Sequence, residues 1–118
     1  MSRDDLQVRT RLYALRVIRL VESLPRGRTA DVIGRQLVRC ATSVGANYRA
    51  ACRARSTNDF IAKLKIVEEE GDESLYWLSL LVDAEFLSEQ QVRGLTKEGN
   101  EIVAMTVASV KTARSRKS

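Results

Sequence analysis

A helix-start signal at Ser56-Thr57-Asn58-Asp59 constrains the fold of this chain more than any other stretch. A serine at a helix N-cap accepts a hydrogen bond from the backbone three residues later, where an acidic residue is favoured. Apolar side chains recur at helical spacing before Ser56 and again from Phe60 onward. Two long helices joined by so tight a corner must lie side by side, as they do in a helical bundle.

Four stretches have the apolar spacing of helices, at about residues 6–24, 30–54, 58–82 and 89–113. Pro25 and Gly27 end the first, because proline cannot continue a helix and glycine accepts any backbone geometry. Thr29 is the expected N-cap of the second helix, and Ser88 with Gln91 forms a capping box before the fourth. We therefore predict an all-α fold, an up-down-up-down antiparallel four-helix bundle, as one domain over residues 1–118.

Three further features of the predicted helices can be checked against a structure. The first helix has a wide apolar face, which predicts more than one neighbour and comprises Leu12, Leu15, Ile18, Val21 and Leu24, widened by Tyr13, Val17 and Leu20. Gly45, in the middle of the second helix, is interpreted as a packing notch or a kink. The basic tail from Lys111 to Ser118 is expected to fray.

Composition agrees with a compact helical protein. One proline and six glycines, with 44% hydrophobic and 30% charged residues, argue against disorder. The sequence shows no secretory signal and no apolar run of the roughly 20 residues that span a membrane, so we expect a cytoplasmic protein without membrane contact. Cys40 and Cys52 would lie about 18 Å apart on one helix, too far to pair, and are expected to be reduced.

Charge is sorted along the chain. Residues 1–55 carry a net charge of +8, residues 56–101 a net charge of −7, and the remainder +4. On the second predicted helix, at about 100° per residue, four arginines fall within an arc of about 80°. We call these residues the arginine ridge: Arg35, Arg39, Arg49 and Arg53. Arginine presents a planar pair of donors that suits phosphate or carboxylate.

Three interpretations of the arginine ridge remain open. It binds nucleic-acid phosphates, helped by Arg9, Arg16 and the tail from Lys111 to Lys117. Alternatively, it pairs with the acidic third helix, within a subunit or between subunits, or it is simply a solvated charged face. The second interpretation makes interface candidates of four residues of the third helix: Glu69, Glu70, Glu73 and Trp77.

Several kinds of catalytic site are improbable because the sequence has no histidine. Carboxylate-bridged di-iron sites, common zinc sites and Ser-His or Cys-His nucleophiles all use histidine. No phosphate-cradling glycine loop is present. Glu70 and Glu73 lie one helical turn apart, but such carboxylates are more often solvated or paired with arginine than catalytic. We predict no catalytic residue, no metal ligand and no cofactor, and hence a non-enzymatic protein.

Four short segments carry a resemblance to a known family: Gly34-Arg35-Gln36-Leu37-Val38-Arg39, Ser43-Val44-Gly45-Ala46-Asn47-Tyr48, Arg55-Ser56, and Asp59-Phe60 with Leu64. Together they resemble the 23S ribosomal RNA intervening-sequence protein family. The resemblance implies a short four-helix bundle without established activity, often assembled as a ring-like homopentamer. It also implies nucleic acid or protein as a partner, since a related retroelement accessory protein binds a reverse transcriptase and nucleic acid through a basic surface. We therefore expect a homo-oligomer, with a pentamer favoured, that acts as an RNA-binding or accessory scaffold.

Overall fold

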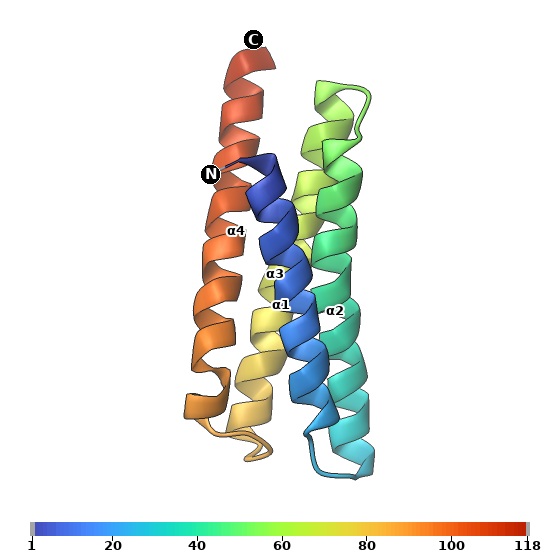
Figure 1. The fold of residues 1–118 in the computed structure, drawn as a ribbon, viewed down its shortest axis with the longest axis vertical. Coiled ribbons are helices and arrows are strands. Elements are labelled where there is room, and N and C mark those ends of the chain that lie inside the picture. Colours follow the sequence, from blue (N-terminus) through green and yellow to red (C-terminus); the bar gives the residue numbers. More distant parts are fainter. Residues whose placement is uncertain (1, 118) are drawn as a thin grey trace.

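The computed structural model describes the backbone of residues 2–117 and the side chains of residues 2–116. Over this range the chain forms four helices, α1 (Arg3–Glu22), α2 (Arg28–Cys52), α3 (Thr57–Asp83) and α4 (Glu89–Lys117) (Figure 1). The bundle measures 50 × 22 × 20 Å. Each helix packs against the next one, and α1 closes the bundle against α4 through the smallest interface. The predicted all-α antiparallel four-helix bundle is confirmed.

The first two helices begin earlier than the sequence predicted. Ser2 caps α1: its Oγ accepts a hydrogen bond from the backbone N–H of Asp5 at 3.1 Å, and the Asp5 carboxylate accepts one from Ser2 N–H. The expectation that Thr29 caps α2 was wrong, because Gly27 occupies the N-cap without a side-chain hydrogen bond. The carbonyl of Gly27 accepts the first helical hydrogen bond, from Asp31 N–H. Glycine is tolerated at this position, so α2 can start two residues sooner.

The corners that flank α3 follow the predicted capping signals. Ser56 Oγ accepts from Asp59 N–H at 3.0 Å, as the corner between α2 and α3 requires. Ser88 and Gln91 exchange hydrogen bonds between side chain and backbone at the start of α4.

Helix α4 continues to Lys117, four residues beyond its predicted end at residue 113, and the fraying of the basic tail stays a prediction. Val110 is buried and Ala113 is half-buried, so the last turns still pack on the bundle. Ser118 and the side chain of Lys117 lie outside the described residues.

On α1, the side chains that are buried in the core lie on a different part of the wide apolar face from the one expected. Leu6, Tyr13 and Val17 are buried, whereas Leu12 and Leu15 are 50% and 36% exposed. The reason is that α1 packs against both α2 and α4, so only the residues that point between these two helices are covered. The other three helices contribute large, fully buried side chains: Leu37 and Val44 from α2; Leu64, Val67, Leu78 and Leu81 from α3; and Ile102 from α4.

Two glycines test how closely the helices approach. A Cβ on Gly45 would lie 3.5 Å from the Thr10 carbonyl oxygen, an ordinary contact, whereas one on Gly99 would lie 2.8 Å from Leu75 Cδ2 and 2.9 Å from the Tyr13 hydroxyl. We expect Gly45→Ala to stabilise the protein by about 0.5–1 kcal/mol through helix propensity. Gly99→Ala should destabilise it by about 1–3 kcal/mol, because Tyr13 must move. Urea unfolding measures both changes, and a loss of stability in Gly45→Ala would contradict this packing.

Candidate functional site

The arginine ridge lies on one unbroken helix. Arg35, Arg39 and Arg49 belong to α2, and Arg53 is its C-cap residue. α2 is continuous from Arg28 to Cys52, so the spacing that placed the four side chains on one side of a helix holds. All four residues are exposed. The structure therefore brings the predicted ridge residues onto a single surface.

Arg39 differs from the rest of the ridge because it is paired within the chain. Its Nη1 donates to Glu70 Oε2 at 2.9 Å, and its Nη2 donates to Glu73 Oε2. Its Nε donates to Gln36 Oε1 at 3.1 Å. Pairing between the ridge and the acidic helix within a subunit is thus observed, but for this arginine alone among the four. Over the described residues, Arg35, Arg49 and Arg53 form no ion pair.

The Glu73 carboxylate accepts hydrogen bonds from three side chains, one of which is Arg39. In addition to the guanidinium, it accepts hydrogen bonds from Cys40 Sγ at 2.9 Å and from Trp77 Nε1 at 3.0 Å. The hydrogen bonds from Cys40 and Trp77, followed by Arg39, lower the pKa of the Glu73 carboxyl. Burial, followed by this same carboxylate, raises the pKa of Cys40 to about 12. The Cys40 thiol therefore stays protonated at neutral pH, and thiolate chemistry is unavailable to it.

The arginines expected to assist the ridge from α1 turn toward α4 instead. Arg9 Nε donates to Glu98 Oε2, and Arg9 Nη2 donates to Glu101 Oε1, both at 2.9 Å. Arg16 lies against Gly94, at the opposite end of α4 from its last turns. We call the contact of Arg9 with Glu98 and Glu101 the α1–α4 clasp. The clasp neutralises the charge of Arg9, and the assisting role of this residue beside the ridge stays a prediction.

Acid is expected to weaken the α1–α4 clasp. Hydrogen bonds from Arg9 lower the pKa of the Glu98 carboxyl from its ordinary value of 4.5. A carboxyl whose pKa is lower in the folded state contributes stability above its unfolded pKa and loses it as the pH falls through the folded pKa. Glu98→Gln should therefore be less stable than wild type at pH 7, and the difference should shrink below pH 4.5. Urea unfolding from pH 7 to pH 3 measures it, and a constant difference would contradict the clasp.

A groove of about 830 Å³ separates α1 from α2 on the surface. Val8 and Leu15 line it, together with Arg49 of the ridge and Arg11 of α1. Val8 is 58% exposed, which is unusual for an apolar side chain inside a groove. The sequence did not link Arg11 to the ridge, because spacing within one helix does not reveal which residues of the next helix lie opposite.

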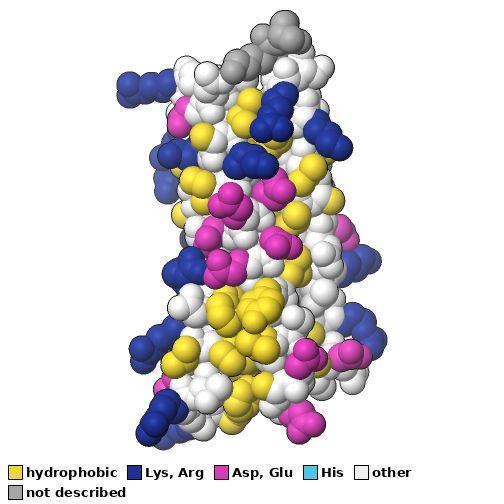
Figure 2. Space-filling view, turned by 180° about the vertical axis from the view of Figure 1, so that it is seen from behind, with side chains coloured by type: hydrophobic (Ala, Val, Ile, Leu, Met, Phe, Trp, Pro, Cys, Tyr) yellow, Lys and Arg dark blue, Asp and Glu magenta, His cyan; other side chains and the backbone are white. Residues whose placement is uncertain are grey.

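The opposite face of the molecule is divided between acidic and apolar side chains. Figure 2 shows acidic side chains gathered across its middle and a hydrophobic patch below them. On α3, the acidic run Glu68–Glu70 precedes Tyr76, which is 56% exposed and packs edge-to-face on Trp77 at 5.1 Å between ring centroids. The interface candidates Glu70, Glu73 and Trp77 all take part in contacts around Arg39 or Glu73, whereas Glu69 is exposed.

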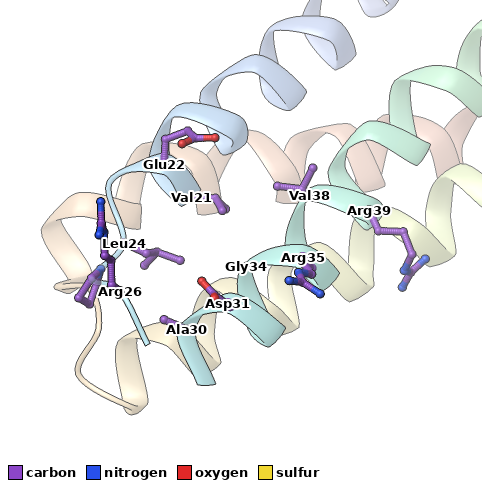
Figure 3. Close-up of a pocket in the computed structure, with 11 residues that line it drawn as sticks. Val21, Glu22, Leu24, Arg26, Ala30, Asp31, Gly34, Arg35, Val38 and Arg39 are labelled. Atoms are coloured by element: carbon purple, nitrogen blue, oxygen red, sulfur yellow. The ribbon is translucent and has the colours of Figure 1, made fainter. Parts of the chain in front are cut away.

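A second hollow, of about 720 Å³, lies where α1 ends and α2 begins. Figure 3 shows Arg26 on the connecting loop and Arg35 and Asp31 together on α2, with Arg39 farther along the helix. Glu22 also lines the hollow. Its charges are therefore mixed, and no anion would meet an unopposed cluster of arginines there.

Neither a metal centre nor a membrane span was found over the described residues. No three histidine, cysteine or acidic side chains in this range are grouped in a way that could hold a metal ion. None of the helices described is both long and apolar enough to cross a membrane.

Comparisons with known proteins agree with the fold. The family model for 23S rRNA-intervening sequence protein matches residues 5–108. A crystal structure of a protein of unknown function from the S23 ribosomal protein family of Bacteroides thetaiotaomicron superimposes with a TM-score of 0.87 and 32% sequence identity. That similarity covers 94% of this chain and 99% of the other. No curated protein matches the chain.

Proposed function

The chain belongs to the 23S rRNA-intervening sequence protein family, and from this premise we propose that it is a non-enzymatic, cytoplasmic homo-oligomer that binds RNA through the arginine ridge. One observation carries the proposal. Arg35, Arg49 and Arg53 are exposed along a continuous helix and, over the described residues, have no carboxylate partner. The family description names 23S rRNA but no ligand, so RNA is proposed because exposed guanidinium groups suit a phosphate backbone.

The three unpaired arginines suit a phosphate backbone. Residues 35 and 53 are separated by about 27 Å along the helix axis, at about 1.5 Å per residue, which spans several phosphates of a strand. Guanidinium groups bind phosphate through two parallel N–H donors. Aromatic side chains are sparse near the ridge, so the proposal predicts contacts to the backbone of the RNA with little preference for its sequence.

Arg39 contributes least in this proposal. RNA could engage its guanidinium only by displacing Glu70 and Glu73, which already hold it. Removing it would also leave Glu73 with fewer donors. Binding therefore rests on Arg35, Arg49 and Arg53.

The direct test is binding of the full chain to a labelled single-stranded RNA over a series of salt concentrations. Phosphate contacts release condensed counterions, so affinity should fall steeply as salt increases. Wild-type protein that fails to bind this RNA at low salt would overturn the proposal.

Self-association is the second part of the proposal, with the pentamer that the family resemblance implies. The apolar side chains that α1 leaves exposed beside the groove support it: Val8, Leu12 and Leu15. A neighbouring copy that covered them would remove apolar surface from water. If a different surface of that copy covers them, the contact is heterologous, and such contacts can close into a ring.

We expect Val8→Lys combined with Leu15→Lys to dissociate the oligomer into monomers, because two charges would be buried in the contact. Sedimentation velocity measures the change. Val32→Lys is the matched control, since Val32 is equally exposed, at 58%, but does not line the groove. A double variant that sediments like wild type, or a wild-type chain that sediments as a 13.2 kDa monomer, would contradict this interface.

A protein-docking scaffold is the alternative function, in which the ridge pairs with the acidic α3 of a neighbouring subunit or partner. The position of Arg49 in the groove beside Val8 and Leu15 favours it. The two functions differ in one outcome. Charge reversal at Arg35 and Arg53, which are exposed and do not line the groove, should weaken RNA binding and spare the oligomer in the first, but should break the oligomer in the second.

A further inference from the structure

A pocket of about 550 Å³ lies at the end of the bundle where α2 turns into α3. Figure 1 shows that α1 begins and α4 ends at this same end. Arg3 of α1, Arg55 of the turn and Arg116 of α4 line the pocket, and no acidic residue does. Its volume lies within the range of about 300–1,000 Å³ that is usual for ligand sites. Three separate elements therefore bring positive charge to one open pocket on the surface.

Four side chains with hydroxyl groups line the pocket together with these arginines. Ser56 and Thr57 line the pocket from the start of α3, and Ser109 and Thr112 line it from α4. On α4, positions 109, 112 and 116 lie three and seven residues apart, so their side chains share one helix face. Among the first backbone N–H groups of α3, that of Asp59 is bound by Ser56 Oγ, whereas that of Thr57 has no acceptor within the helix. Phosphate oxygens would meet hydrogen-bond donors on both sides of the pocket.

The arginines of the pocket are not neutralised by the protein. The guanidinium carbon of Arg3 lies 4.7 Å from the centre of the Phe60 ring, a cation–π contact that fixes its position and leaves its charge intact. Over the described residues, Arg3, Arg55 and Arg116 form no ion pair. The hollow at the α1–α2 loop differs, since Glu22 and Asp31 oppose its arginines.

We propose that this pocket binds a phosphate group of an RNA strand. The proposal rests on the proposed function and adds a second phosphate contact to it. The arginine ridge leads to the pocket, because Arg53 is two residues from Arg55 and Ala51 and Ala54 of the same segment line the pocket. A strand that follows α2 past Arg49 and Arg53 thus reaches the three arginines at its end.

The test compares two double variants of the full chain in binding to a 12-nucleotide single-stranded RNA labelled at its 3′ end. Arg55→Gln with Arg116→Gln removes two charges from the pocket. Arg19→Gln with Arg28→Gln is the matched control, because these arginines are exposed and neither lines the pocket. We expect about a tenfold rise in the dissociation constant for the pocket variant and about a twofold rise for the control. An equal rise in both would overturn the pocket and leave the ridge intact.

A second readout locates the phosphate directly. Addition of the same RNA should shift the backbone amide NMR signals of Ser56 and Thr57 in wild type, and this shift should be lost in the pocket variant. Tighter binding of RNA with a 5′-phosphate than of RNA with a 5′-hydroxyl would indicate a terminal phosphate in the pocket, whereas equal binding of both would indicate an internal one. Shifts confined to α2 would overturn the pocket alone, whereas wild-type protein that binds neither RNA would overturn the proposed function as well.

Discussion

Replacing Arg49 and Arg53 with glutamate is expected to weaken RNA binding about 100-fold at about 100 mM salt. Each substitution removes a guanidinium that has no partner in the described part of the chain and places a negative charge near the phosphates. Both residues are exposed near the end of α2, so the fold should tolerate the change. Fluorescence anisotropy with a labelled RNA measures the loss.

The control for this result is a second charge reversal of equal size. Arg19→Glu with Arg26→Glu changes the net charge by the same amount, and both residues are exposed on α1 and the following loop. If position matters, this control should weaken binding only a few-fold, through long-range electrostatics. Equal losses in both variants would mean that net charge alone attracts RNA. Sedimentation of Arg35→Glu with Arg53→Glu, neither of which lines the groove between α1 and α2, must also show an intact oligomer, because its dissociation would favour the protein-docking alternative.

Replacing Arg9 with methionine is expected to destabilise the fold by about 2 kcal/mol. Methionine keeps the apolar stem of the side chain but leaves Glu98, only 19% exposed, without the guanidinium that binds it. Loss of a fully buried partner costs about 3–5 kcal/mol, and the partial exposure of this pair reduces that value. The effect should be large for one residue because α1 and α4 share the smallest interface of the bundle.

Arg11→Met is the matched control for the α1–α4 clasp. Arg11 lies on the same helix, is exposed, and forms no ion pair among the described residues, so its loss should change the unfolding free energy by less than about 0.5 kcal/mol. A double-mutant cycle between Arg9→Met and Glu98→Gln should give a coupling of about 1–2 kcal/mol. A coupling near zero would show that the two side chains do not act as a pair.

The antiparallel arrangement could be predicted because its signals are local. Ser56 and Ser88 cap α3 and α4 where their neighbours in the sequence indicated. The ridge could be predicted for the same reason, since its four positions depend only on the continuity of α2. The capping box at Ser2 has the same local character and was overlooked, so α1 begins earlier than expected.

What could not be predicted depends on how one helix sits against another. The exposure of Leu12 and Leu15 follows from the way α1 packs against both α2 and α4. The pairing of Arg9 with Glu98 joins residues 89 positions apart, and Glu73 selects Arg39 from the four arginines of the ridge. The pocket formed by Arg3, Arg55 and Arg116 draws on three elements. A single sequence carries no signal for such register, so charge sorting indicated that the ridge could pair with the acidic helix but not which of its arginines does so.

The claim that the ridge contacts RNA phosphates is tested most directly by the salt dependence of binding. The slope of log Kd against log salt concentration counts the phosphates that the protein neutralises, at about 0.7 per phosphate for a single strand. With both guanidinium groups removed, as in Arg49→Gln with Arg53→Gln, we predict a slope shallower than that of wild type by about 1.4. Identical slopes for the two proteins would show that neither arginine contacts a phosphate and would contradict the account.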